Sequence, residues 1–393
     1  MTQRFAIVLT AIVVSTSVVA QGPDDDDDPD PKVIQRYVDD LGSDLFRDRE
    51  TSTAALRKIG ESAIPFLRRK QNSLDEEMRR RVLDLLADIE TKAQRFCLTG
   101  HEKGVIGLTL VPGDRQALSA SEDKTIGLWD LNDGKLLKRF TGHEKQVWAL
   151  AVAPDGMSFS SGSQDTTVRL WSLQAESAPR VLATLPESVR ALQFTADGTK
   201  LLAAAYDHRI HVIDVKSAKV EAVWEGHNDI VLCMALSPDG KTVLSGGGFR
   251  DATVCLRDAK SGAVLKRLVG HRGAVHAVAF TGNDHAISAG RDDIIRLWDL
   301  KTGTVQREFT GHKNGIVALA VSRDGKRMLS GAYDKEVRLW ELSTGDELRR
   351  YHHHEGGINA VAFTADRRFA VTASDDRSVR VCYLPRAKKN PRH

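Results

Sequence analysis

The chain has 393 residues, of which 56 are Lys or Arg and 53 are Asp or Glu. This near balance hides an acidic stretch close to the N-terminus and a basic tail at residues 385–393. Neither end by itself indicates nucleic acid, so charge gives no reason to expect a nucleic-acid partner.

The first 20 residues have the pattern of a secretory signal. Arg4 precedes an apolar run, and the residues Val18, Val19 and Ala20 before Gln21 predict cleavage after Ala20. The apolar stretch up to Ala20 covers 16 residues, and a helix that spans a membrane needs about 20. An uncleaved membrane anchor is therefore the alternative. We expect an exported chain, periplasmic or secreted, that contacts a membrane only if the signal is retained.

Residues 21–31 form an acidic segment with five consecutive aspartates, Asp24 to Asp28. Such a charge run predicts a solvated, self-repelling linker. Calcium binding is a less favoured alternative, because the run lacks the glycine-turned loop of a calcium site.

Residues 32–94 predict a small helical domain. The segment around Gly60 predicts a helix, a glycine break and a second helix that starts near Pro65, and Ser73 is a candidate cap for a third helix. The apolar residues of that third helix recur at helical spacing and are Leu74, Met78, Val82, Leu85, Leu86 and Ile89. The pattern over about 44–90 resembles one HEAT-type helical pair plus a third helix. That resemblance implies a surface for protein contact, and the alternative is a plain helical cap.

A repeat of about 42 residues occupies the rest of the chain. Seven aspartates recur at intervals of 42, 42, 44, 41, 42 and 42 residues: Asp123, Asp165, Asp207, Asp251, Asp292, Asp334 and Asp376. Gly-His pairs stand at Gly100-His101, Gly142-His143, Gly226-His227, Gly270-His271 and Gly311-His312. Between the pairs, apolar residues alternate with period two, and Asp-Gly or Thr-Gly turns follow. Each repeat therefore predicts a four-stranded antiparallel unit.

With the terminal pairs Trp129-Asp130 and Trp298-Asp299, this pattern resembles the WD-repeat β-propeller family. The resemblance implies an all-β, seven-bladed β-propeller over residues 95–384, beside the small α-helical N-terminal domain. Because the last blade needs an outer strand, we expect residues 95–98 to supply it and close the ring.

The resemblance also implies a buried hydrogen-bond network in each blade, joining a histidine, a serine, the turn aspartate and the tryptophan. Complete sets are His101, Ser119, Asp123 and Trp129; His143, Ser161, Asp165 and Trp171; His271, Ser288, Asp292 and Trp298; and His312, Ser330, Asp334 and Trp340. The third repeat keeps only Asp207, the fourth has Arg257 in the tryptophan position, and the seventh has Cys382 there.

The Ser, His and Asp of one set also have the residue types of a hydrolase triad. Four copies of one arrangement favour a structural role, since a catalytic site is needed once. No nucleophile elbow, phosphate loop or metal-spaced Cys/His pair is present in the sequence. We therefore expect neither catalytic residues nor a metal or other cofactor.

Four cysteines, Cys97, Cys233, Cys255 and Cys382, raise the question of disulfides. A two-residue turn places Phe96 opposite Cys382, so Cys97 points to the other face. Cys233 and Cys255 lie two strand spacings apart, which exceeds disulfide reach. All four are expected to be reduced and buried.

Function is expected on the propeller face that carries the loops between blades and between the second and third strands. The resemblance implies partner contacts at the third and fifth residues after the Gly-His histidine and at the residue before the turn aspartate. These positions include Gln146, Trp148, Gln164, Arg190, Tyr206, Arg250, His276, Arg291, Tyr333 and Asn359. Trp, Tyr and Arg dominate interface hot spots, and Glu122 and Asp375 would form an acidic sector opposite Arg250 and Arg291.

The sequence therefore predicts a monomeric, non-catalytic scaffold that binds a protein partner. One alternative is a small ligand or glycan bound by Trp148, Tyr206 and Tyr333. The other is an enzyme at the central channel, which would require convergent carboxylates or a metal set there.

Overall fold

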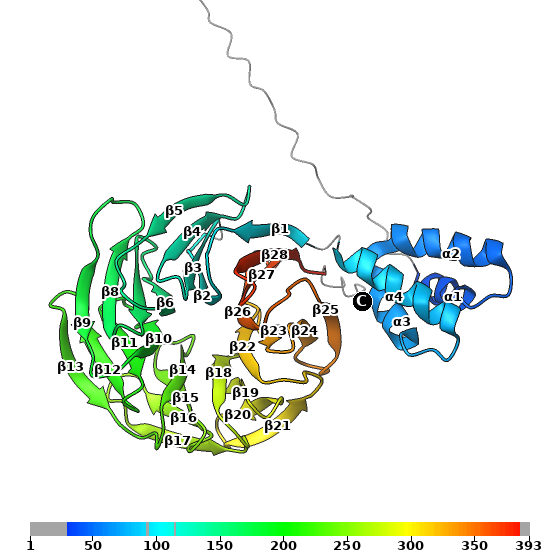
Figure 1. Cartoon of the computed structure of the whole chain (residues 1–393). Coiled ribbons are helices and arrows are strands. Elements are labelled where there is room, and N and C mark those ends of the chain that lie inside the picture. The colour runs from blue at the N-terminus through cyan, green and yellow to red at the C-terminus, as the bar shows by residue number, and fades with distance from the viewer. Residues whose placement is uncertain (1–29, 92–93, 114, 386–393) are drawn as a thin grey trace, which may run out of the picture. The chain divides into compact units, whose positions relative to one another are not determined.

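The computed structural model describes residues 30–91, 94–113 and 115–385, and within them the strands form seven four-stranded antiparallel sheets arranged as a ring (Figure 1). The predicted seven-bladed β-propeller with a small helical N-terminal region is confirmed. The predicted signal (1–20), most of the acidic linker and the basic tail beyond residue 385 lie outside the described residues.

The blades have the following strands, innermost first. Blades one to four are β2 (Val105–Leu110), β3 (Gln116–Ser121), β4 (Ile126–Asp130) and β5 (Leu136–Phe140); β6 (Val147–Val152), β7 (Ser158–Ser163), β8 (Thr167–Ser172) and β9 (Arg180–Thr184); β10 (Val189–Phe194), β11 (Lys200–Ala205), β12 (Ile210–Asp214) and β13 (Lys219–Trp224); and β14 (Val231–Leu236), β15 (Thr242–Gly247), β16 (Thr253–Asp258) and β17 (Val264–Val269). Blades five to seven are β18 (Val275–Phe280), β19 (His285–Gly290), β20 (Ile295–Asp299) and β21 (Thr304–Phe309); β22 (Ile316–Val321), β23 (Arg327–Ala332), β24 (Val337–Glu341) and β25 (Glu347–Tyr351); and β26 (Ile358–Phe363), β27 (Phe369–Ser374), β28 (Ser378–Tyr383) and β1 (Gln94–Thr99).

The ring is closed by the start of the propeller sequence. β1 pairs antiparallel with β28, so the last blade takes its outer strand from the segment before the first repeat (Figure 1). The innermost strands contact one another around the ring, and β2 contacts β26 across the closing junction.

Small residues on the second strand of each blade let neighbouring blades pack closely. A Cβ atom placed on Gly162 would lie 2.5 Å from Cγ1 of Val189 in the next blade, and one placed on Gly331 would lie 2.5 Å from Cγ2 of Ile358. These strands are buried along almost their whole length. The cores therefore lie between blades, where the faces of adjacent sheets meet.

Each innermost strand contains a β-bulge at the same place. The pairing with the second strand skips one residue in every blade, and that residue is the fifth after the histidine position. The seven skipped residues are Ile106, Trp148, Arg190, Leu232, His276, Val317 and Asn359. A bulge leaves its residue outside the ladder and redirects the side chain, which is why bulges are common beside functional sites.

A cation on the outer strand joins most blades to the next. Lys138 Nζ donates to the Ala175 carbonyl at 3.0 Å, and Lys266 Nζ donates to the Leu300 carbonyl at 3.1 Å. Arg95, Arg180, Arg307 and Arg349 also donate to carbonyls of the following blade. The corresponding residue in blade three is Ala222, so the described residues show no such bond from β13 to blade four.

The helical residues form α1 (Pro31–Asp40), α2 (Phe46–Ile59), a 3-10 turn (Gly60–Ala63), α3 (Ile64–Lys70) and α4 (Glu76–Thr91). The chain divides into two compact units with a boundary after Arg81, inside α4. Four short helices support the HEAT resemblance only weakly. None of the helices in the described residues is long and apolar enough to cross a membrane.

Two details of the predicted helical domain are wrong. Leu74 precedes α4 and is fully exposed, so it is not part of the apolar helix face. The cap is Asp75, whose Oδ1 accepts the Met78 backbone N–H at 2.7 Å, rather than Ser73. The first helix, α1, begins at Pro31, the last residue of the predicted linker, and Asp30 caps it. It precedes the segment of about 44–90 in which the sequence pattern predicted helices.

All four cysteines are free, but Cys97 is exposed rather than buried. The predicted register at the closing junction also differs, because Gln94 faces Cys382 and Phe96 faces Val381. A bulge at this point adds one residue to β1, and a sequence pattern does not show a bulge.

Candidate functional site

The complete blades contain a buried network centred on one serine hydroxyl. In blade two, His143 Nδ1 lies 2.7 Å from Asp165 Oδ2, and His143 Nε2 lies 2.6 Å from Ser161 Oγ. Trp171 Nε1 donates to the same hydroxyl at 2.7 Å. Blades one, five and six repeat this arrangement, with the corresponding distances between 2.7 and 3.0 Å.

The pKa of the aspartate is lowered in each of the four complete networks. Burial raises the pKa of the Asp165 carboxyl, but hydrogen bonds from His143, Thr167 and the Glu144 backbone outweigh burial and hold the pKa well below its usual range. The serine hydroxyl lies between two ring nitrogens inside the blade, where no substrate reaches it. This geometry orders the blade and leaves no free nucleophile.

The incomplete blades recruit other side chains. In blade three, His211 Nε2 lies 2.8 Å from Asp207 Oδ2, so the aspartate still holds a buried histidine, which the repeat pattern did not predict. In blade four, Arg257 takes the tryptophan position and its Nε donates to Ser245 Oγ at 3.1 Å. Blade seven joins His354 to Asp376 at 2.7 Å and to Thr372 at 2.8 Å.

One group in the described residues has the donor types of a metal site. Ligand atoms of His312, Asp334 and Glu336 lie within 4.8 Å of one another. However, His312 Nδ1 is bonded to Asp334, and Glu336 Oε2 accepts two hydrogen bonds from Arg338. His312 and Asp334 are thus part of the blade network, and Glu336 forms an ion pair with Arg338.

The central channel contains a cavity of about 190 Å³, lined by the innermost strands. Six of the seven bulge residues line it, namely Trp148, Arg190, Leu232, His276, Val317 and Asn359. No carboxylate is among the lining residues. The cavity therefore lacks the convergent carboxylates that a catalytic channel would require.

Aromatic side chains gather on one side of the channel mouth. The rings of Trp148 and Tyr206 lie 5.4 Å apart between centroids, and Trp148 Nε1 donates to Gln146 Oε1 at 3.0 Å. The Gln164 backbone N–H donates to the Gln146 carbonyl at 2.9 Å. Blades two and three thus present one joined aromatic and amide surface.

Arg190 and His276 line the cavity, and Arg291 lies in the loop between β19 and β20. Burial and the charges of Arg190 and Arg291 lower the pKa of His276 to about 4. Arg291 lies over two glycines: a Cβ atom placed on Gly273 would be 3.1 Å from Arg291 Cβ, and one on Gly315 would be 3.6 Å from Arg291 Cδ. Within the described residues, no side-chain hydrogen bond or ion pair is shown for Arg190 or Arg291.

The same glycines connect this region to two exposed aromatic residues. A Cβ atom placed on Gly273 would lie 4.0 Å from Phe249 Cε1, and one placed on Gly315 would lie 3.3 Å from Tyr333 Cδ2. Phe249 is 64% exposed and Tyr333 is 37% exposed. Phe249 was not among the predicted contact residues, although the 44-residue interval before Asp251 indicates the longer loop that carries it beside Arg250.

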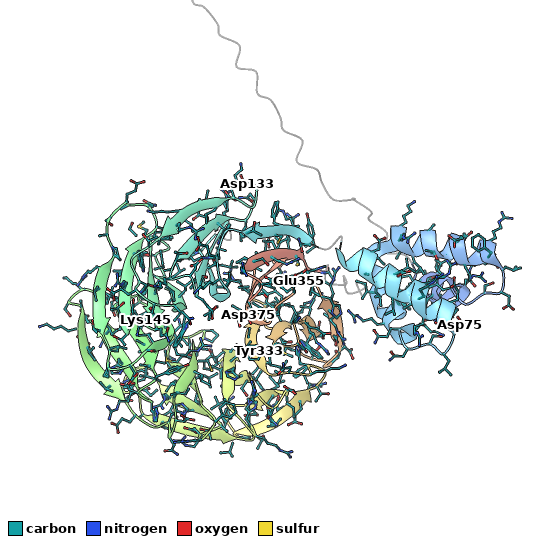
Figure 2. The ribbon with its side chains drawn as sticks, in the orientation of Figure 1. Asp75, Asp133, Lys145, Tyr333, Glu355 and Asp375 are labelled. Carbon is teal, nitrogen blue, oxygen red and sulfur yellow. The ribbon has the colours of Figure 1, made fainter. Side chains whose placement is uncertain are left out.

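The acidic residues lie on the remaining part of this face. Figure 2 shows Tyr333 and Asp375 beside the centre of the ring, whereas Asp133 lies at its outer edge. A Cβ atom placed on Gly104 would lie 3.3 Å from Asp375 Oδ1 and 3.5 Å from Glu122 Oε2. Asn359 Nδ2 donates to Asp375 Oδ1 at 2.6 Å and to the Val105 carbonyl at 3.0 Å, so its amide joins blade seven to blade one.

Comparison with protein families gives one match, which covers the propeller. The family model described as WD domain, G-beta repeat matches residues 92–130, 134–172, 179–214, 218–258, 262–299, 303–341 and 345–382. Each match covers the outer strand of the preceding blade and the first three strands of its own blade, so the seven matches correspond to the seven blades with an offset of one strand.

The similar curated proteins match over short stretches. U3 small nucleolar RNA-interacting protein 2 of Homo sapiens is 37% identical over 79 residues, which are 20% of this chain and 16% of that protein. Small ribosomal subunit protein RACK1y of Oryza sativa subsp. japonica is 33% identical over 88 residues, 22% of this chain and 25% of that protein. The chain thus spans a quarter or less of the length of these relatives.

These relatives correct the prediction of export. They are named for a nucleolar RNA and for a ribosomal subunit, and both names point away from an exported protein. The prediction of a periplasmic or secreted chain is therefore wrong by this comparison.

Together, the seven matched repeats and the seven blades show that this chain belongs to the WD-repeat family.

Proposed function

We propose that this protein is a non-catalytic scaffold that binds a protein partner on the loop-bearing face of its propeller. One observation supports this most strongly: Trp148, Tyr206, Phe249, Arg250, Arg291 and Tyr333 come from five consecutive blades and lie on the same face. Aromatic and arginine side chains combine large contact area with hydrogen-bonding tips, and they dominate binding energy at interfaces.

The alternatives have less support from the geometry. Trp148 pairs with Tyr206, but the described residues show no ring contact between Tyr333 and either of them, so the three aromatics do not form one stacking platform. The cavity volume of about 190 Å³ is below the roughly 300 Å³ at which small-molecule pockets begin. A broad protein contact fits this face better than a small ligand or a glycan does.

The test compares exposed residues on opposite faces of the ring. Phe249 and Met157 are similarly exposed, at 64% and 62%, but Met157 lies beside a turn between the first and second strands. Arg291 on the loop face is matched by Arg115 in another such turn, and both are exposed. Truncation of an interface anchor costs about 2 kcal/mol, or roughly thirtyfold in affinity.

The partner is first identified by crosslinking and then purified. We expect Phe249→Ala and Arg291→Ala to lower the affinity for this partner by about thirtyfold in a titration. Met157→Ala and Arg115→Ala should bind normally. The proposal would be contradicted if the Met157 and Arg115 variants lost affinity while Phe249→Ala and Arg291→Ala bound normally. The interface would then lie on the opposite face.

A further inference from the structure

Arg190, which lines the channel cavity, and Arg291, which lies between β19 and β20, show no ion pair in the described part of the chain. Arg190 reaches the cavity from the bulge of β10, and His276 reaches it from the bulge of β18. Arg291 extends from the loop between β19 and β20. The nearby carboxylates are engaged elsewhere: Asp229 accepts the Arg250 and Ile230 backbone N–H groups, and Asp293 accepts the Gly315 backbone N–H.

The position of these cations favours a single negative group over a long polyanion. Leu232, Val317 and Trp148 line the same cavity as Arg190 and His276. Glu122 and Asp375 lie together on another part of the same face, where they would repel a phosphate backbone. Nucleic-acid binding instead depends on several cations that follow the backbone.

We propose that Arg190, His276 and Arg291 form an anion-binding subsite at the channel mouth that receives one acidic side chain of the protein partner. The inference rests on the proposed function and adds the chemical class of the recognised group. Arginine binds a carboxylate through paired N–H donors, and Leu232 and Val317 in the same cavity would contact the methylene groups of a glutamate. The acidic pair Glu122 and Asp375 would favour a basic residue elsewhere in the partner segment.

The pKa of the His276 imidazole should change when an anion binds at this site. The charges that act on its imidazole come from Arg190 on β10 and Arg291 in the β19–β20 loop, and Cys233 on β14 lines the same cavity as a neutral thiol with a pKa of about 12. An anion beside these arginines offsets their charge, and a negative group close to an imidazole raises its pKa by about one unit or more.

The experiment is an NMR pH titration of His276 in the full chain, assigned with a His276→Gln variant. The probes are a blocked glutamate, a blocked glutamine, inorganic phosphate and a uridine oligonucleotide. We expect blocked glutamate to raise the His276 pKa from about 4 by about one unit, and blocked glutamine to leave it unchanged. The rise should be lost in Arg190→Met and in Arg291→Met, and retained in Arg250→Met.

An unchanged His276 titration in glutamate, or an equal rise in the Arg190 and Arg291 variants, would overturn the subsite. A larger response to phosphate or to the oligonucleotide than to glutamate would also overturn it, since the recognised group would not be an acidic side chain. These failures leave the proposed function intact if Phe249→Ala still loses the partner. Conversely, a glutamate response with normal partner binding by Phe249→Ala refutes the loop-face interface and not the anion site.

Discussion

At the scale of single residues, one serine hydroxyl connects three parts of a complete blade. Ser161 Oγ is hydrogen-bonded to the His143 imidazole and to the Trp171 indole, and His143 is also hydrogen-bonded to Asp165. Because all these groups are buried, removing one leaves the others without partners. A buried donor or acceptor without a partner costs about 1 to 3 kcal/mol.

His143→Ala should therefore lower the free energy of unfolding by about 1 to 3 kcal/mol in urea melts. The control is Lys145→Ala, which removes an exposed side chain from the same loop and should change stability little. Equal midpoints for the two variants would show that the network does not stabilise the blade.

The family pattern predicted the members of the complete networks but not the substitutes. His211 stands four residues after Asp207 and bonds to it, and Arg257 occupies the space of a tryptophan. Both depend on side-chain packing inside the blade, which spacing along the chain does not reveal. Phe249 was not predicted for a related reason. The contact residues were chosen at fixed distances from the histidine and the turn aspartate, and those distances assume a loop of standard length.

At the scale of elements, the outer strands do more than cover their blades. Lys138 and Lys266 lie on outer strands and donate to carbonyls of the next blade. Each pairs with the third-strand residue that precedes the tryptophan position, which is Leu128 for Lys138 and Leu256 for Lys266. A sequence pattern shows a basic residue on an exposed strand, and only the ring arrangement brings that residue to a neighbouring turn. The junction between blades three and four lacks this bond, since Ala222 occupies the position.

Lys266→Met should lower stability by about 1 kcal/mol, because it removes a charged donor while keeping the length of the apolar stem. Lys219→Met, on exposed outer strand β13, is the matched control and should behave like the natural chain in urea melts. If both variants lost the same stability, the contribution would come from net charge rather than from the contact between blades.

At the scale of the whole molecule, the period of the repeats was enough to predict seven blades and the closing strand. Register was harder: the bulges in the innermost strands are invisible in an alternating pattern, yet they place Trp148, Arg190 and His276 around one cavity. The repeat positions predicted these residues one by one. Their convergence at the channel mouth follows from closure of the ring.

The most direct test of the loop-face interface is hydrogen–deuterium exchange of the full chain with and without its purified partner. We expect slower exchange in the loops before β6, β10 and β18 and in the β15–β16 loop around Phe249, with no change in the turns that contain Arg115 and Met157. Protection confined to those turns or to the outer strands, with the loop face unchanged, would contradict the account.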